Sequence, residues 1–291
     1  MQSRVAYIAS VARSGSTLLG LLLKEHPAVV DAGEADWARP YLIGDYRRLC
    51  TCGAPLKQCA FWQAVRDRFG DLAAQDPTFG HMARLPWRRS LGRVAAWSGL
   101  PVAERAACQV AARHALRWLQ AVAEVANRPV VVDASKSVTR LHFLHHAAPD
   151  RVAVVHLVRD GRAIAWSRMR RHKLGMAKAA SYWLANTLAL DLALQRIADP
   201  QVFLLRYETL CTAPQSELNR LAIWLGLQPF VLPPHIGRHN AHVLGGNPMR
   251  MEADNRDVVL DAAWQTALST RDLAVFDAIA GWRNRKLGYR D

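Results

Sequence analysis

Small polar residues fill positions 10–17, read SVARSGST, between a strand-like apolar run and an apolar helical run. A glycine-containing turn that opens a helix offers backbone N–H groups and the positive end of the helix dipole to an anion. In nucleoside triphosphatases such a loop reads G-x-x-x-x-G-K-[ST]. Gly15 and Thr17 match this pattern, but Ser16 takes the place of the lysine. The residues predict an anion-binding loop that lacks the lysine of a triphosphatase.

A second candidate anion site follows the apolar run at 151–158. Arg159 ends this run, and Gly161 allows a turn into a helix. Ser167 and Arg171 are four residues apart and therefore share a face of that helix. Arginine donates a planar fork of N–H groups that fits phosphate oxygens. We expect these side chains to converge on one phosphate; a solvated basic helix end is the alternative interpretation.

A third polar stretch, DASKSVTR at 133–140, also follows an apolar strand-like run. In open parallel sheets, ligands bind beyond the carboxyl ends of the strands. The loop at 10–17, the stretch at 133–140 and the helix that follows Arg159 all begin at such ends. We therefore expect the three stretches to contribute to one site.

The elements that would position these residues alternate along the chain. Four apolar runs rich in β-branched residues, and a shorter fifth candidate, have the pattern of strands buried on both faces of a parallel sheet. They lie at 4–10, 129–135, 151–158 and 201–208, with the shorter candidate at 28–34. Helical patterns lie at 16–25, 103–125, 138–147, 162–171, 177–197 and 214–225. The alternation predicts an α/β fold, with a P-loop-like central parallel β-sheet flanked by helices on both faces.

The length of 291 residues suits a single domain spanning 1–291. We interpret about 40–125 as a helical, cysteine-containing insertion. Its part at 40–100 either covers the site and binds the acceptor or is structural only. From Pro233 onward, a His- and Gly-rich loop precedes an amphipathic helical pattern at 270–289.

The chain is strongly basic, with a formal net charge of +14, and arginine outnumbers lysine. Such a surface favours an anionic partner, which includes a nucleotide, a nucleic acid, an acidic glycan or a membrane face. A solvated surface of arginine-biased composition is the alternative. We find no secretory signal pattern and no apolar stretch of about 20 residues. We therefore expect a soluble, cytoplasmic protein without a membrane span.

Three of the five cysteines cluster as C-x-C-x6-C at Cys50, Cys52 and Cys59. A structural zinc site needs four ligands, and no fourth ligand is apparent nearby in the sequence. A local disulfide is also conceivable, but the odd number of cysteines argues against a secreted disulfide framework. We expect reduced or redox-labile thiols here, ahead of a zinc knuckle, and no bound metal.

The two phosphate patterns together resemble those of the sulfotransferases that use 3′-phosphoadenosine 5′-phosphosulfate (PAPS). SVARSGSTLL resembles the loop that holds the 5′-phosphosulfate, and LVRDGRAIAWS resembles the 3′-phosphate motif. The closest resemblance is to bacterial relatives of the tyrosylprotein and carbohydrate sulfotransferases. Further similar segments are EHPAVVDAGE, DASKS, LRYETL, GGNPMR, DAAWQTAL and the block CTCGAPLKQCAFW.

The resemblance implies that PAPS is the co-substrate and 3′,5′-adenosine bisphosphate (PAP) the product. Residues at the 5′ end would be Arg13, Ser14, Gly15, Ser16 and Thr17. Residues at the 3′-phosphate would be Arg159, Ser167 and Arg171. Tyr207 would support the nucleotide, and Gly246, Asn247 and Arg250 would clasp it. PAPS carries a single sulfuryl group on a 5′-phosphate and a separate 3′-phosphate, so a loop without lysine suffices and no metal is expected.

The expected reaction is in-line transfer of the sulfuryl group to an acceptor hydroxyl, which needs a base and cationic donors. Glu34 is the candidate base, on the resemblance, and a capping or salt-bridged carboxylate is its alternative role. Arg13 and Lys136 are the candidates for charge stabilisation. Other candidates for the base are Asp31, Asp36, His142, His145 and His146.

Two further functions remain open at this stage. A P-loop kinase of small molecules would bind ATP with Mg²⁺, and Asp133 is the one fair candidate for holding the metal. The interpretation as a nucleic-acid-binding protein depends on charge alone, because no recognisable motif supports it. We expect no nucleic-acid partner. The acceptor would be a carbohydrate, a tyrosine or a small natural product, possibly acidic. It would be bound by loops such as 37–60, 84–100 and 172–178, and the sequence does not fix the oligomeric state.

Overall fold

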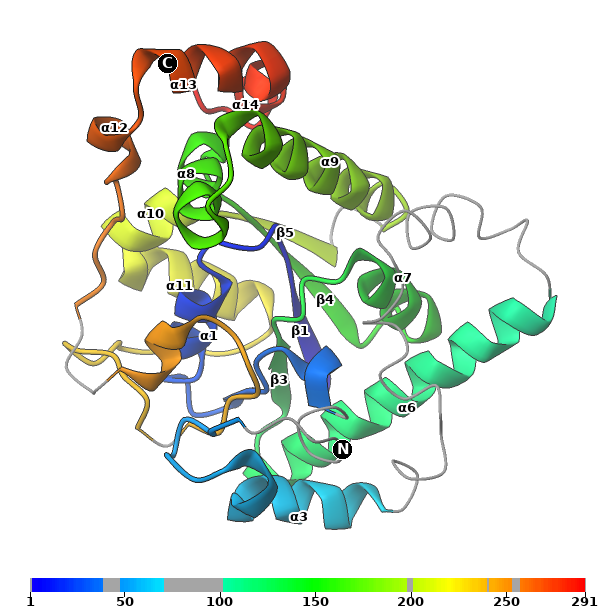
Figure 1. Ribbon diagram of the computed structural model, residues 1–291. Coiled ribbons are helices and arrows are strands. Elements are labelled where there is room, and N and C mark those ends of the chain that lie inside the picture. Colours follow the sequence, from blue (N-terminus) through cyan, green and yellow to red (C-terminus); the bar gives the residue numbers. More distant parts are fainter. Residues whose placement is uncertain are drawn as a thin grey trace.

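The computed structural model describes residues 2–38, 48–70, 102–197, 201–239, 241–252 and 257–290. Within these ranges the chain forms a sheet of five parallel strands in the order β2-β3-β1-β4-β5 (Figure 1). The strands are β1 (Arg4–Ala9), β2 (Val29–Asp31), β3 (Val130–Asp133), β4 (Val152–Val158) and β5 (Val202–Arg206). The central strand is β1, where Val5 pairs with Val131 on one side and Val152 on the other.

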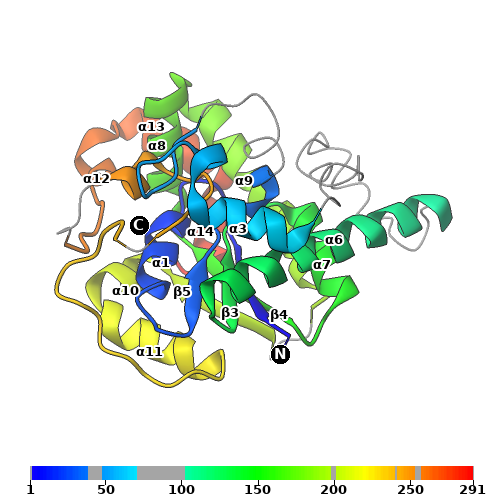
Figure 2. The same cartoon turned by 90° about the horizontal axis from the view of Figure 1, so that it is seen from below.

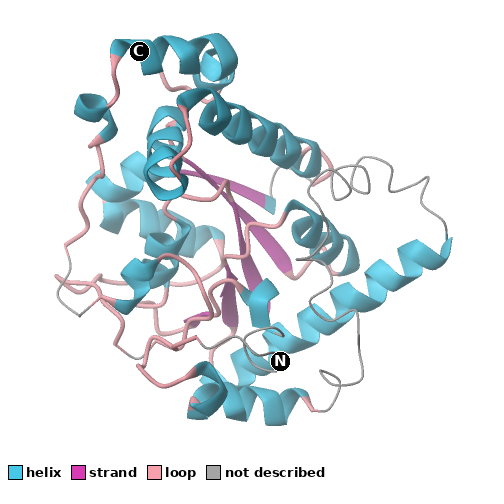
Figure 3. Ribbon diagram, viewed as in Figure 1, coloured by secondary structure: helices cyan, strands magenta, loops and turns pink. Residues whose placement is uncertain are grey.

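Helices cover both faces of this sheet (Figure 3). Val5 and Tyr7 of β1 point into one hydrophobic cluster, and Ala6 and Ile8 point into the other, as the alternation of side chains along a strand requires. The first face carries α3 (Ala60–Phe69), α6 (Val102–Ala126) and α7 (Val138–Ala147). The second face carries α1 (Ser16–Leu23), α10 (Tyr207–Thr212) and α11 (Pro214–Trp224). In the view from below, α3 and α6 run next to each other (Figure 2).

A third cluster joins the chain after β4 to the C-terminal helices. It draws on α8 (Gly161–His172), α9 (Met176–Leu194), α13 (Thr270–Phe276) and a π-helical turn at Asp277–Gly281, and α14 (Trp282–Lys286) follows that turn. The short helix α12 (Trp264–Ala267) precedes α13. A Cβ at Gly161 would lie 2.7 Å from Trp183 and from Phe276. Glycine is therefore required at the start of α8 because two helices pack closely against its backbone.

The predicted α/β fold with a central parallel sheet is confirmed. The region interpreted as an insertion contributes to the core, since Trp62 of α3 stacks on Trp118 of α6 at a centroid distance of 6.1 Å. Residues 39–47 and 71–101 of that region lie outside the described residues. Among the described helices, none is long and apolar enough to cross a membrane.

The parallel arrangement brings the carboxyl ends of all the strands to one edge of the sheet. The loop after β1 leads into α1, residues 134–137 lead from β3 into α7, and Arg159 and Asp160 lead from β4 into α8. Ser137 caps α7 by accepting a bond from the Arg140 N–H, and Asp160 caps α8 by accepting one from the Arg162 N–H. These caps start the two helices shortly after the strands end, so the polar stretches between strand and helix lie together at this edge of the sheet.

Candidate active site

The loop between β1 and α1 is a tight turn that opens the helix toward a cavity. The Ser14 hydroxyl donates to the carbonyl of Val11 at 2.7 Å, which closes the turn. Arg13 has φ 81° and Gly15 has φ 91°, and a Cβ at Gly15 would overlap the ring of Tyr207. Gly15 precedes α1 and has no side chain to cap it. The first N–H groups of α1 therefore remain available to a bound anion.

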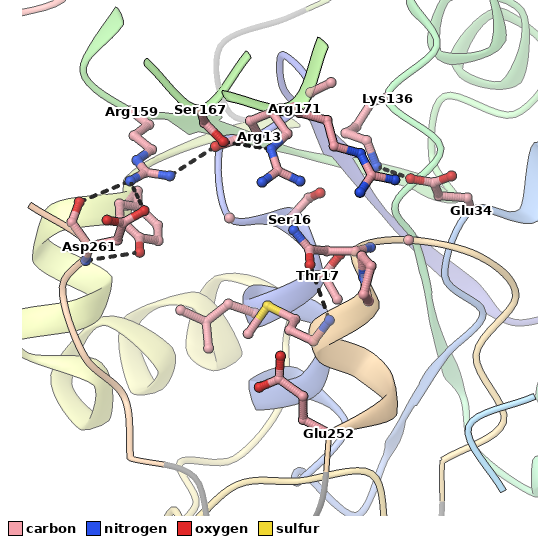
Figure 4. Close-up of a pocket in the computed structure, with 18 of the residues that line it drawn as sticks. Arg13, Ser16, Thr17, Glu34, Lys136, Arg159, Ser167, Arg171, Glu252 and Asp261 are labelled. Atoms are coloured by element: carbon pink, nitrogen blue, oxygen red, sulfur yellow. Dashed lines mark hydrogen bonds and ion pairs between the residues drawn. The ribbon is translucent and has the colours of Figure 1, made fainter. Parts of the chain in front are cut away.

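A cavity of about 380 Å³ lies against this loop (Figure 4). Its walls come from the loop and the start of α1, the ends of β2, β3 and β4, helix α8, Tyr207, and two C-terminal segments. The volume falls within the range typical of small-molecule sites, about 300–1,000 Å³. The predicted residues that line it are Arg13, Gly15, Ser16, Thr17, Glu34, Lys136, Arg159, Ser167, Arg171, Tyr207, Gly246 and Asn247.

Direct bonds join the two predicted phosphate motifs. The Arg13 guanidinium donates through Nε to the Ser167 hydroxyl at 2.7 Å. Arg159 donates to the main-chain carbonyl of Arg13 at 3.0 Å. The two motifs are more than 140 residues apart in sequence, yet they form one wall of the cavity.

The Arg159 guanidinium is held on three sides. It is 7% exposed and lies over the ring of Tyr207, with 4.2 Å between the guanidinium carbon and the ring centroid. It also donates to the carbonyl and the carboxylate of Asp261, at 3.0 and 3.1 Å. Its buried Nε has no hydrogen-bond partner among the described residues. The guanidinium is therefore fixed in position where it lines the cavity.

Positive charge is concentrated around Arg13. Burial, and then the charges of Arg171 and Arg159, lower the pKa of Arg13 from its ordinary value. Nearby like charges disfavour one another's charged form, and an opposite charge among them relieves this. The arrangement therefore favours a bound anion between the loop and α8, where Arg171 also reaches the cavity.

Glu34 and Lys136 form an ion pair at the opposite wall of the cavity (Figure 4). The Lys136 ammonium donates to Glu34 Oε1 at 2.7 Å and to the carbonyl of Ala134 at 2.7 Å. Lys136 follows β3 and has φ 59°, while Glu34 follows β2 and its N–H donates to the carbonyl of Leu244 at 2.9 Å. Both side chains keep some exposure, 22% for Glu34 and 13% for Lys136.

The other candidates for the base lie outside the cavity lining. Asp31 is buried and accepts a bond from the Gly33 N–H at 2.8 Å. Asp36 is buried and pairs with Arg140 at 3.6 Å. Burial raises the pKa of each carboxyl to about 6. The histidines at 142, 145 and 146 lie on α7, and none lines the cavity.

The C-terminal loop closes over the start of α1. The Asn247 N–H donates to the Thr17 hydroxyl at 3.1 Å, and the Asn247 side chain accepts a bond from Met249 N–H, which starts a 3₁₀ turn at Pro248–Met251. Arg250 lies elsewhere: it is buried and donates to the carbonyls of Val243 and Leu49. Arg250 therefore holds two loops together, outside the cavity lining.

Comparison with known proteins identifies the family. The sequence model of the sulfotransferase family matches residues 6–230, which include both phosphate motifs and the Glu34–Lys136 pair. The chain belongs to the sulfotransferase family. Among curated proteins, no sequence matches this sulfotransferase.

Solved structures that resemble this sulfotransferase have low sequence identity. The sulfotransferase domain from the curacin biosynthetic pathway has a TM-score of 0.53 and 18% identity, and covers 100% of this chain and 99% of that one. The sulfotransferase domain of the Synechococcus PCC 7002 olefin synthase has a TM-score of 0.46 and 19% identity, with 96% of each chain covered. STF1 from Mycobacterium tuberculosis H37Rv has a TM-score of 0.49 and 16% identity, covering 78% of this chain and 68% of that one. At 18% identity, the similarity to the curacin-pathway domain shows a shared fold and no more.

Several residues that line the sulfotransferase's cavity were not named singly from the sequence, although five of them lie in the segments SVARSGSTLL, GGNPMR and DAAWQTAL. They are Ala12, Leu18, Pro248, Met249, Glu252, Asp257, Val259 and Asp261. Among them, Asp261 contacts two predicted site residues. Its carboxylate accepts a hydrogen bond from Arg159, and its N–H donates to the Tyr207 hydroxyl at 3.4 Å. Burial raises the pKa of Tyr207 to about 12, so its hydroxyl stays protonated. Ser14, in contrast, was expected at the phosphate, and its hydroxyl faces Val11 instead.

Proposed function

We propose that this sulfotransferase moves the sulfuryl group of PAPS to an acceptor hydroxyl by in-line displacement. The observation that carries the proposal is the junction of two cationic groups in one cavity, the loop at 13–17 and Arg159, joined through Arg13 and Ser167. A nucleotide with phosphate at both its 3′ and 5′ positions needs two such groups. A ligand with one phosphate chain needs one.

The residues present fit the two ends of PAPS. At the 5′ end, the free N–H groups at the start of α1 and the hydroxyls of Ser16 and Thr17 supply neutral donors. At the 3′ end, Arg159 and Ser167 supply donors, and Arg171 adds charge. The Tyr207 ring packs against the Arg159 guanidinium in a cation–π contact.

Glu34 acts as the base in this proposal. Lys136 holds one carboxylate oxygen of Glu34 at 2.7 Å, which leaves the other oxygen to take the proton of the acceptor hydroxyl. When bound, PAPS supplies the sulfuryl group: the acceptor oxygen bonds to sulfur while the bond from sulfur to the 5′-phosphate oxygen breaks. The electron pair of that bond stays on the leaving PAP. Lys136 and Arg13 stabilise the negative charge that develops there.

The geometry does not favour the kinase alternative. A kinase needs a carboxylate that reaches Mg²⁺ beside the phosphates. Asp133 was the candidate, but it is fully buried, accepts a bond from Arg140 Nε at 2.8 Å and is absent from the cavity lining. The Asp133 carboxylate is already paired with Arg140, and the Ser135 N–H is a further donor to it. The position of a triphosphatase lysine is occupied by Ser16.

Thermal denaturation with two nucleotides tests the proposal. At a concentration about 100 times its Kd, PAP without added metal is expected to stabilise the protein by about 2.7 kcal/mol. ATP with Mg²⁺ is expected to give a smaller shift at the same concentration. Transfer of sulfur-35 from labelled PAPS to a panel of sugars, tyrosine peptides and phenols then identifies the acceptor class. Stabilisation by ATP–Mg²⁺ alone, or the absence of any transfer from PAPS to water or acceptor, would contradict the proposal.

We propose a hydroxyl-bearing carbohydrate, tyrosine or small natural product as acceptor, in keeping with the chemistry of Glu34. Of the loops expected to bind it, residues 37–38, 48–60 and 172–178 are described, whereas 39–47 and 84–100 lie outside the described residues.

A further inference from the structure

Four metal-ligating side chains meet outside the cavity. They are Cys50, Cys52, Cys59 and His242, and their ligand atoms all lie within 4.8 Å of one another. None of them lines the cavity described above. We propose that these residues bind one Zn²⁺ in a structural Cys₃His site. The proposal is independent of the reaction proposed above, because it rests on these side chains alone.

The distances match a tetrahedral zinc centre. Zinc lies about 2.3 Å from thiolate sulfur and about 2.0–2.1 Å from imidazole nitrogen. A tetrahedron of that size puts two sulfurs about 3.8 Å apart and a sulfur and a nitrogen about 3.6 Å apart. The sulfurs of Cys52 and Cys59 are 3.7 Å apart. His242 Nδ1 lies 3.6 Å from the Cys50 sulfur and 3.3 Å from that of Cys59.

The surrounding chain holds the four ligands in place. A turn between Cys50 and Ala54 presents the first two sulfurs, with the Cys50 N–H donating to the Ala54 carbonyl at 2.8 Å. Thr51 ties this turn to the histidine's segment: its hydroxyl donates to the carbonyl of Ala241 and accepts the Val243 N–H at 3.1 Å. The His242 ring stacks on Phe61 at 4.7 Å and 7°, which fixes the direction of Nδ1.

All three cysteines are free thiols, and a disulfide between Cys52 and Cys59 would need their sulfurs about 2.05 Å apart. Cys50 and Cys59 are buried, and Cys52 is exposed. Four protein ligands leave no open position on a tetrahedral zinc ion, which is the arrangement of structural sites. The proposal differs from the expectation of thiols without metal because folding brings His242, a fourth ligand that the sequence did not indicate, to the cysteine cluster.

A zinc ion here would brace one wall of the donor site. Two residues beyond His242, Leu244 pairs with the chain at Gly33 and accepts the N–H of Glu34. A short distance further on, Asn247 contacts Thr17. The metal would therefore join the cysteine segment to the loop that positions both the candidate base and the start of α1.

Metal analysis of the purified full chain tests this inference. The protein, prepared without chelators, is expected to contain about one zinc per chain, measured by inductively coupled plasma mass spectrometry. Replacement by Co²⁺ is expected to give the visible bands of a tetrahedral site and a thiolate-to-cobalt charge-transfer band. A chain with no zinc, with iron in its place, or with a disulfide among these three cysteines would overturn the proposal.

Cys52→Ser provides the matched variant, because Cys52 is exposed and its replacement leaves the packing of the fold intact. Loss of an outer-shell partner already costs about 10- to 100-fold in metal affinity, so loss of a direct ligand is expected to lower the zinc affinity at least about tenfold, measured by competition with a chelator at equilibrium. Cys108→Ser, on α6 outside the cluster, is the control and should release zinc as the wild type does. Equal release from all three proteins would overturn the role of Cys52.

His242→Ala should lose zinc to the chelator as readily as Cys52→Ser does. Circular dichroism of both variants checks that they keep their helical fold.

Discussion

Replacing Arg159 with alanine is expected to lower the affinity for PAP by about 30-fold or more, which corresponds to about 2 kcal/mol. Bonds from a guanidinium to a phosphate are charge-assisted and come in pairs. Arg159 is 7% exposed, so its charge meets little screening by water. Its contact with Tyr207 and its bonds to Asp261 already fix its direction, and little side-chain entropy is lost on binding.

Calorimetric titration of PAP into the two proteins measures this effect. Arg159 also donates to the Arg13 carbonyl. The variant's melting temperature must therefore be recorded, to separate loss of nucleotide binding from loss of the conformation of the loop at 13–17. Arg170→Ala is the matched control: Arg170 is an exposed arginine on the same helix and is absent from the cavity lining. It should bind PAP as the wild type does. An Arg159→Ala protein that folds and binds PAP with unchanged affinity would remove Arg159 from the nucleotide site.

Glu34→Gln is expected to reduce kcat by about 100-fold or more while leaving the affinity for PAP within about twofold. Glutamine can still accept the bond from Lys136 through its amide oxygen, so the pair should keep its geometry. It cannot take a proton from the acceptor hydroxyl. The effect is thus expected on the chemical step rather than on nucleotide binding.

Single-turnover transfer from labelled PAPS, once an acceptor is known, gives the rate of that step. Glu217→Gln on α11 serves as the control, because Glu217 pairs with the exposed Arg220 and is absent from the cavity lining. It should turn over at the wild-type rate. A Glu34→Gln rate close to that of the wild type would place the base elsewhere.

The parts of this protein that sequence could predict are those set by local pattern. Apolar runs such as 151–158 indicate buried parallel strands, and their order with the helices determines the fold class. The glycine and hydroxyls of the loop at 13–17, and the spacing from Arg159 to Ser167, are likewise local. Their convergence followed from the rule that parallel strands end at one edge, and the structure places both groups in one cavity.

The parts that sequence could not predict depend on contacts between distant segments. His242 lies 183 residues from Cys59, so no spacing in the sequence connects the two. Asp261 reaches Arg159 across 102 residues; the resemblance marked its segment, DAAWQTAL, but nothing in the sequence showed that its carboxylate would meet Arg159. The role of the Ser14 hydroxyl depends on the conformation of its own turn, since the bond to Val11 directs it away from the cavity.

The central claim is that the loop at 13–17 and the group around Arg159 bind opposite ends of one nucleotide. A crystal structure of the protein with PAP tests it most directly. The account predicts the 5′-phosphate at the N–H groups that begin α1, and the 3′-phosphate within hydrogen-bond distance of Arg159 and Ser167. PAP with its 3′-phosphate in solvent, or bound at only one of these two groups, would contradict it.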